Sequence, residues 1–331
     1  MSKKWLVLTL KFLVLGFLFW FLSRGIDFAD AARRVAAIDP LMLVGAAGIM
    51  LVQICVGGQR WRLVLSAIGA DLSIFKAIQL FYIGVFFSQA LPSSVGGDAV
   101  RMFKIYNLGM ELRNAINGVI LERAVTVVAL VALIDVTHQW FLPRVDAATA
   151  AVMLPAVALV TVGCAGGLVF LMVLDRLPSS LTRWRLVRGL GNLGIDARKV
   201  FLVPGNLVRV MFWGILTHIN MALIVLILAL GLGLDVTLLD CLTLVPPVML
   251  IMTIPISIGG WGVRETAMVT LFGLIGVPGE GAFALSVVFG LTGIAVAIPG
   301  GIIWLMSRDK GETMDYQAPD ETLNEKKSVE T

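Results

Sequence analysis

The sequence predicts an all-α polytopic membrane protein with about six full spans and two inverted re-entrant helical hairpins that form an internal repeat. Of the 331 residues, 58% are hydrophobic and 15% are charged, whereas a soluble domain averages about 45–50% and about 25%. The mean hydropathy is +0.93. A soluble fold of this size does not bury so many apolar side chains, so a bilayer must surround most of the chain. The composition therefore excludes a cytosolic enzyme, a nucleic-acid-binding domain and a disordered chain.

Apolar runs of about 20 residues predict the full spans, since that length of helix crosses a bilayer. Six runs qualify: Trp5–Leu22, Leu41–Val56, Ile116–Thr137, Ala151–Leu174, Leu207–Leu230 and Ala282–Met306. Three others are shorter or are interrupted: Ile74–Leu91, Leu238–Ile256 and Thr266–Val277. The segments Phe28–Ile38 and Leu181–Phe201 mix apolar and basic residues, and this pattern is typical of helices that lie in the membrane interface.

The distribution of basic residues predicts the orientation. Asp175–Arg209 contains seven basic and two acidic residues, so we expect this segment in the cytoplasm. The connections Ser23–Asp39 and His138–Ala150 have balanced charge and are expected outside. The result is a single membrane domain, 1–306, in a bacterial-type inner membrane with both termini cytoplasmic. Its repeat halves, about 40–174 and 207–306, are joined by the basic segment 175–206 and followed by a polar tail, 307–331, expected to be disordered.

An internal repeat is the strongest signal in the sequence. Leu91–Arg101 (LPSSVGGDAVR) and Ile254–Arg264 (IPISIGGWGVR) share the pattern P-x-S-x-G-G-x-x-V-R. Proline ends the incoming helix and the glycine pair allows turns that other residues resist. Each copy therefore predicts a helix, a break and a second helix with an arginine near its start. The positive potential of a helix N-terminus adds to that arginine, so each break is a candidate anion site.

The charge distribution also orients the two breaks. If each is the tip of a hairpin, the first (about Ile74–Leu112) enters from the cytoplasm and the second (about Leu238–Val277) enters from outside. Inverted repeats of broken helices are typical of transporters whose substrate site lies near the midplane. The alternative is that each copy is a short ordinary loop followed by a helix cap.

Four motifs carry a resemblance to a known family. They are Gly58-Gln59-Arg60-Trp61-Arg62, PSSVGGDAVR at 92–101, Glu122-Arg123 and PISIGGWGVRE at 255–265. With them the chain resembles the lysylphosphatidylglycerol synthase transmembrane-domain family of flippase-like proteins over roughly residues 5–306. The resemblance implies the handling of a lipid or a lipid-linked glycan. Bifunctional members carry a soluble aminoacyltransferase domain after the membrane part, and we expect that activity to be absent here.

Two charged residues inside a predicted span identify a candidate site. A charge at the bilayer centre costs at least about 2.5–3.5 kcal/mol, so Glu122 and Arg123 should be paired inside the protein. Arg101 or Arg264 is the expected partner of Glu122, and Asp98 or Glu265 that of Arg123. A structural lattice of ion pairs and an arginine that binds phosphate both remain open. The candidate substrate-binding residues are Ser94, Gly96, Gly97, Asp98, Arg101, Glu122, Arg123, Ser257, Gly259, Gly260, Arg264 and Glu265.

Other polar residues receive simpler interpretations. We interpret Arg60, Trp61 and Arg62 as headgroup anchors at the end of the second span, or alternatively as the place where substrate enters. His218 and Asn220 in the fifth span are expected to make hydrogen bonds between helices rather than to relay protons.

The favoured function is a lipid translocase that moves a polar or anionic headgroup through a cavity between the two hairpins. An ion or small-solute secondary transporter is the alternative, and an intramembrane lipid-modifying enzyme is less favoured because no G-x-S-x-G or H-E-x-x-H motif occurs. We expect no enzymatic activity, no metal, no cofactor and no nucleic-acid partner. The expected partners are membrane lipids: a phospholipid, an aminoacylated lipid or an isoprenoid-linked lipid.

Overall fold

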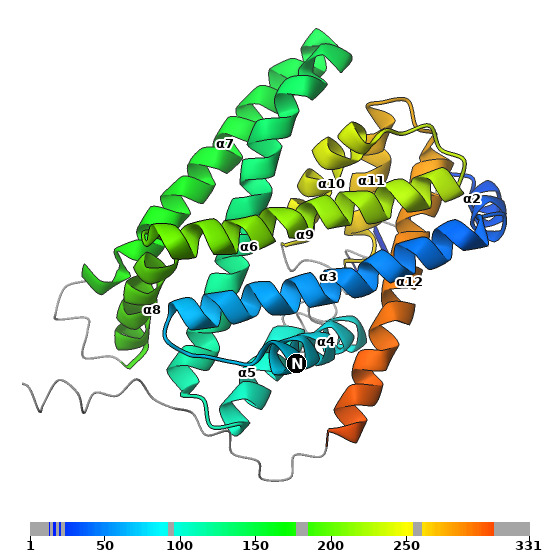
Figure 1. Ribbon diagram of the computed structural model, residues 1–331. Coiled ribbons are helices and arrows are strands. Elements are labelled where there is room, and N and C mark those ends of the chain that lie inside the picture. The colour runs from blue at the N-terminus through cyan, green and yellow to red at the C-terminus, as the bar shows by residue number, and fades with distance from the viewer. Residues whose placement is uncertain are drawn as a thin grey trace, which may run out of the picture.

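The computed structural model describes residues 24–91, 96–176, 185–253 and 260–307, together with Leu13, Gly16, Phe17 and Trp20. In these residues every regular element is a helix (Figure 1), so the expected all-α class is confirmed. The expected first span, Trp5–Leu22, lies mostly outside the described residues, and the expected polar tail lies outside them after Ser307.

Four of the described helices are long and apolar enough to cross a membrane. They are α3 (Pro40–Ala67), α7 (Ala147–Met172), α9 (Pro204–Gly231) and α12 (Gly279–Met306). Helices α3, α9 and α12 each contain one of the predicted full spans, and α7 covers all but the last two residues of the predicted span Ala151–Leu174. A further predicted span, Ile116–Thr137, lies within the 30-residue helix α6 (Leu112–Phe141).

Local sequence explains where these helices begin. Pro40 occupies the first turn of α3, and Asp39 caps it by accepting a hydrogen bond from the Leu41 amide at 2.8 Å. Asp146 caps α7 by accepting from the Thr149 amide at 2.6 Å. The connection expected at His138–Ala150 is therefore shorter, because α6 continues to Phe141 and a 3₁₀ turn, η1 (Leu142–Arg144), leads directly into α7.

Both copies of the repeated motif separate two helices that pack against each other. The first hairpin consists of α4 (Ile74–Ala90) and α5 (Gly96–Asn107), and the second of α10 (Leu238–Met252) and α11 (Val263–Gly273). The motif residues 92–95 and 254–259 lie outside the described part of the chain.

The hairpins pack across the two halves of the chain. Helices α3 and α9 run alongside each other through the middle of the molecule. Helix α4 packs against α3 and also against α12, whereas α10 packs against α9 and also against α6. Helix α5 packs against α6, and α11 against α12. Helices α3, α4, α5 and α6 thus correspond in their packing to α9, α10, α11 and α12, in that order.

The contact between α4 and α12 is a close backbone approach. Tyr82 donates a hydrogen bond from its hydroxyl to the Val296 carbonyl at 2.7 Å. A Cβ at Gly300 would lie only 2.5 Å from the Tyr82 carbonyl oxygen. Small residues allow this spacing, as they commonly do between membrane helices.

Two helices lie at the places expected for interfacial segments. Helix α2 (Phe28–Ala36) packs against α12, and α8 (Arg185–Phe201) packs against α6, α7, α9 and the 3₁₀ turn η2 (Leu174–Arg176). Arg198 of α8 donates two hydrogen bonds to Asp175, each 2.6 Å long. These bonds lower the pKa of the Asp175 carboxyl from its usual value. These bonds hold α8 against η2, which follows the end of α7.

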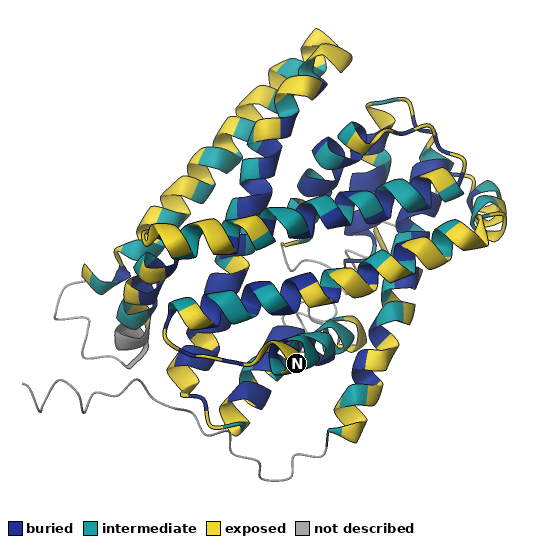
Figure 2. Ribbon diagram, in the orientation of Figure 1, coloured by how far each residue is buried: buried dark blue, intermediate teal, exposed yellow. Residues whose placement is uncertain are grey.

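Helix α7 differs from the other long helices because none of its residues is buried. Its main contacts are with α6, α8 and η2. Figure 2 shows exposed residues along most of its length, while α6 beside it is buried over a larger share. In Figure 1 the joined ends of α6 and α7 rise beyond the other helices, while the rest of α6 packs against α3, α5, α9 and α10.

Candidate functional site

Five charged side chains meet where the first hairpin packs against α3 and α6. This first cluster contains Arg60 of α3, Asp98 and Arg101 of α5, and Glu122 and Arg123 of α6. Four of the five are buried, and only the Arg123 side chain is half-exposed, at 53%. A buried group of this kind must be closely paired, because an isolated charge at this depth is costly.

Hydrogen bonds connect the five side chains into one network. Arg60 donates through Nε and Nη2 to Oε1 of Glu122. Arg101 donates through Nη2 to Asp98 Oδ1 at 2.5 Å and to Glu122 Oε2 at 3.2 Å. Arg123 donates through Nε to Asp98 Oδ2 at 2.8 Å. Each carboxylate therefore joins two guanidinium groups.

Outside this network, Arg60 also binds Thr217 of α9. Its Nη1 donates to the Thr217 hydroxyl oxygen at 2.6 Å. The first cluster therefore contacts α9 of the other half of the chain.

The charge of the first cluster is not balanced. Three guanidinium groups face two carboxylates, so these five side chains carry one excess positive charge. Among the described residues, Nη1 of Arg101 has no hydrogen-bond partner although the side chain is only 4% exposed. An unsatisfied buried donor costs about 1–3 kcal/mol and more when it is charged. Arg101 therefore carries a buried donor that the other four side chains of the cluster do not satisfy.

Aromatic rings and glycines position the Arg101 side chain. Its guanidinium carbon lies 4.9 Å from the ring centre of Trp61 and 4.8 Å from that of Phe81, within the range of cation–π attraction. Its aliphatic part crosses Gly84 of α4, where a Cβ would lie 2.7 Å from Arg101 Cγ. A Cβ at Gly97 would overlap the Gly84 carbonyl oxygen. The first hairpin thus needs glycine on both helices to bring Arg101 into the network.

The second cluster, at the second hairpin, consists of Arg264 and Glu265 of α11 and Ser286 of α12. Arg264 donates through Nη2 to Glu265 Oε1 at 2.7 Å and through Nε to the Ser286 hydroxyl at 3.0 Å. Ser286 in turn donates to the same Glu265 oxygen at 3.0 Å. The other Glu265 oxygen accepts from the Gly262 amide at the start of α11. The pair is neutral, and both carboxylate oxygens are occupied.

The structure brings together only part of the predicted site. Glu122 binds Arg101 and Arg123 binds Asp98, each one of the two partners expected for it, and Gly96 and Gly97 lie in the same hairpin. Arg264 and Glu265 form the separate second cluster, and Gly260 precedes it with φ of 82°. The remaining predicted residues, Ser94, Ser257 and Gly259, lie outside the described residues.

The interpretation of Arg60 and Trp61 as headgroup anchors is wrong. Arg60 is 4% exposed and Trp61 is fully buried, because α3 continues to Ala67 instead of ending near Val56. Gly58 permits this packing, since a Cβ there would lie 2.7 Å from the Ile78 Cα atom of α4. The sequence did contain a signal for this burial: Gly57 and Gly58 lie just before Arg60, and small residues allow another helix to pack closely there.

The polar residues of α9 make hydrogen bonds between helices, as expected. His218 Nε2 lies 3.0 Å from the Thr126 carbonyl oxygen. Asn220 donates to Gln53 at 2.8 Å and to the Ile49 carbonyl at 3.2 Å. Within the described ranges no three metal-ligating side chains come together.

These features define a helical, multi-pass membrane protein with buried ionic clusters beside two broken helical hairpins. The chain belongs to the family described as Lysylphosphatidylglycerol synthase TM region, which it matches over residues 8–301. No curated protein and no solved structure matches the chain. The family and the apolar helices together fit a membrane protein related to lipids.

Proposed function

We propose that the protein is a lipid translocase, in which Arg101 binds the polar or anionic headgroup of a membrane lipid as it crosses the bilayer. The observation that carries this proposal is Nη1 of buried Arg101, which has no partner among the described residues, in a cluster with one excess positive charge. A phosphate or carboxylate oxygen would satisfy that donor and neutralise the excess charge. Guanidinium suits the task, because it remains charged and binds phosphate in a planar, bidentate geometry.

The carboxylates of the first cluster fit a holding role in this proposal. Asp98 and Glu122 both bind Nη2 of Arg101, and no residue in the described part of the chain binds Nη1, which the headgroup would bind in this proposal. The guanidinium is thus oriented before the headgroup arrives, which reduces the entropy lost on binding. Half-exposed Arg123 at the edge of the cluster offers a polar approach to Asp98.

The proposed path uses both hairpins as inverted re-entrant elements, the first entering from the cytoplasm and the second from outside. Helices α4 and α10 have 17 and 15 residues, fewer than the roughly 20 needed to cross a bilayer. Their counterpart packing, α4 with α12 and α10 with α6, also supports an inverted arrangement. In this orientation both termini are cytoplasmic in a bacterial-type inner membrane, with basic α8 on the same side.

The cargo in this proposal is a membrane lipid that keeps its covalent structure. Its headgroup passes the first cluster while its chains remain in hydrocarbon. Phospholipids, aminoacylated lipids and isoprenoid-linked lipids all have the required combination of polar head and apolar chain. The protein then acts without catalysis and needs no cofactor.

Purified protein in vesicles that contain fluorescent phosphatidylglycerol tests the proposal. We expect Arg101→Gln to slow the loss of headgroup asymmetry by about tenfold or more, as the removal of charged hydrogen bonds worth about 1.5–3 kcal/mol implies. Arg101→Lys should restore only part of the rate. The matched control is Arg113→Gln, which removes an ion pair to Asp196 of α8 rather than one in the cluster.

Melting temperatures measured beside transport separate binding from structure. If Arg101 has only a structural role, Arg101→Gln should lower the melting temperature while the transport rate per folded molecule stays at the parent value, because Arg60 and Arg123 still pair with Glu122 and Asp98. Full transport by a stable Arg101→Gln protein, alone or with Arg264→Gln, would contradict the proposal that Arg101 binds the headgroup. Uptake of a small solute without lipid movement would favour the secondary transporter, and a changed lipid mass would favour an enzyme.

A further inference from the structure

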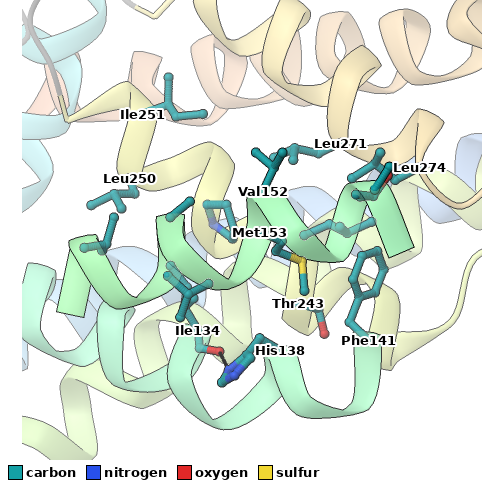
Figure 3. Close-up of a pocket in the computed structure, with 17 residues that line it drawn as sticks. Ile134, His138, Phe141, Val152, Met153, Thr243, Leu250, Ile251, Leu271 and Leu274 are labelled. Carbon is teal, nitrogen blue, oxygen red and sulfur yellow. Dashed lines mark hydrogen bonds between the residues drawn. The ribbon is translucent and has the colours of Figure 1, made fainter. Parts of the chain in front are cut away.

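A slot of about 640 Å³ lies between the α6–α7 pair and the second hairpin, away from the first cluster. Figure 3 shows its walls: Ile134 and His138 on α6, Val152 and Met153 on α7, and Leu250 on α10 among them. The slot exists because α7 packs mainly against α6 and α8, while α10 packs against α6. Helices α7 and α10 therefore stand apart above the surface of α6.

The slot has the chemistry of a hydrocarbon site. Its lining is aliphatic or aromatic except for His138, Thr149 and Thr243. Most of their polar atoms have partners: His138 Nδ1 lies 3.2 Å from the Ile134 carbonyl oxygen, the Thr243 hydroxyl donates to the Leu239 carbonyl, and Thr149 binds Asp146. A polar ligand would find few partners there and would lose its hydration.

The slot is long enough for an extended apolar chain. Along α7 the lining extends from Ala148 to Val160, which at about 1.5 Å per residue is about 18 Å. A helix from a second copy is the other apolar occupant to consider, and crosslinks between two copies inside the slot would reveal it. An extended peptide would bury unpaired amides and carbonyls in this lining.

We infer that the slot binds one hydrocarbon chain of a membrane lipid. Its length is close to the depth of one leaflet, half of the roughly 30 Å hydrocarbon core. One end lies at the α6–α7 connection, between Phe141 and Ala148, which the positive-inside pattern assigns to the outer side. The bound lipid therefore belongs to the outer leaflet, and its chain lies against α10 and α11. The inference deepens the proposed function, on which it rests, by assigning a place to the chain of the lipid beside the second hairpin.

Photo-crosslinking tests the slot directly. The probe is phosphatidylglycerol with a diazirine in one acyl chain, in vesicles that contain the full-length protein. We expect labelled peptides to concentrate on slot residues of α7 and α10 and to decrease with excess unlabelled lipid. Val157→Trp, which fills the slot, should remove most of this labelling. Leu159→Trp is the matched control, since Leu159 is 74% exposed and does not line the slot.

The outcomes keep the slot and the proposed function separate. Three outcomes would each overturn the inference. They are uniform labelling around α7, labelling that Val157→Trp leaves unchanged in a folded protein, and crosslinks between two copies inside the slot. Labelling of the slot that persists in Arg101→Gln supports a chain site independent of the headgroup site. Slot labelling in a parent protein that moves no lipid would overturn the translocase proposal alone, and transport without slot labelling would overturn the slot alone.

Discussion

The two hairpins place an arginine at the same position of the same sequence pattern, yet the arginines have different surroundings. Arg101 shares Asp98 and Glu122 with two further arginines and keeps one nitrogen unpartnered among the described residues. Arg264 has its own carboxylate and a serine, in a neutral group with both carboxylate oxygens engaged. Among the described residues, the first cluster therefore has an excess positive charge and an unpartnered donor, whereas the second is neutral.

The difference arises from the helix that each hairpin packs against. Helix α6 presents Glu122 and Arg123 to the first hairpin, and α12 presents Ser286 to the second. The repeated sequence therefore gives both hairpins a break and an arginine. The helix packed against each hairpin determines which side chains bind that arginine. We expect ligand binding at the first hairpin and a mainly structural role for the second cluster.

The largest expected effect follows from the glycines at the breaks. Gly97→Val should abolish transport and remove most of the protein from the membrane fraction, because its Cβ would overlap the backbone of α4. Gly260→Val should be less severe: its φ of 82° disfavours a side chain, but its Cβ meets only the flexible end of Met252. Gly166→Val is the control, since nothing lies within 4 Å of its Cβ position. Equal yields and transport rates for all three would contradict the packing described at the first hairpin.

The carboxylates give the next largest effect. Glu122→Gln and Glu265→Gln should each lower the free energy of unfolding by about 3–5 kcal/mol, because each leaves a buried guanidinium without its carboxylate. A second substitution, of the paired arginine, should act differently in the two clusters. Added to Glu265→Gln, Arg264→Gln should restore most of the lost stability. Added to Glu122→Gln, Arg101→Gln should restore less, because Arg60 still lacks its partner. Melting temperatures for both double-mutant cycles measure this, and equal coupling in the two clusters would remove the distinction between them.

Ser286→Ala should have a moderate effect limited to the second cluster. It removes two hydrogen bonds, one from Arg264 and one to Glu265, and should cost about 1–3 kcal/mol because buried partners remain. We expect a lower melting temperature with little change in transport per folded molecule. Ser307→Ala, which removes a hydrogen bond at the end of α12, is the control. A transport loss as large as that of Arg101→Gln would show that the second cluster also acts on the cargo.

The smallest expected effect lies outside both hairpins. Bonding to Arg198 lowers the pKa of Asp175 in the folded protein. In the unfolded chain this carboxyl has its usual pKa of about 3.9. As the pH falls toward that value, the unfolded chain therefore takes up a proton before the folded protein does. The stabilisation is present above that pH and is lost as the pH falls through the lowered folded pKa. Asp175→Asn should therefore show a shallower decrease of melting temperature between pH 5 and pH 3, with unchanged transport at pH 7. A decrease as steep as that of the parent would show that the pair contributes nothing to acid sensitivity.

Sequence alone predicts features that depend on neighbouring residues in the chain. The breaks follow from proline and glycine, and α3, α7, α9 and α12 follow from apolar length. Arg60 could not be placed in this way, because its burial depends on α4 approaching Gly58 from elsewhere in the sequence. Ser286 gave no signal, since one serine in an apolar helix is common and becomes important only beside Arg264. The binding role of the predicted site residues stays a prediction.

The packing of α4 against α12 has a consequence for synthesis of the protein. Tyr82 and its partner Val296 are separated by most of the chain. At about 5–20 residues per second, a ribosome takes roughly 10–40 s to make the stretch between those helices. During that interval α4 can pack against α3, and against α5 once α5 has been made, but it lacks its contact with α12. The packing of the first half is therefore completed by α12, the last of the described helices, and we expect folding to finish only after α12 has been made.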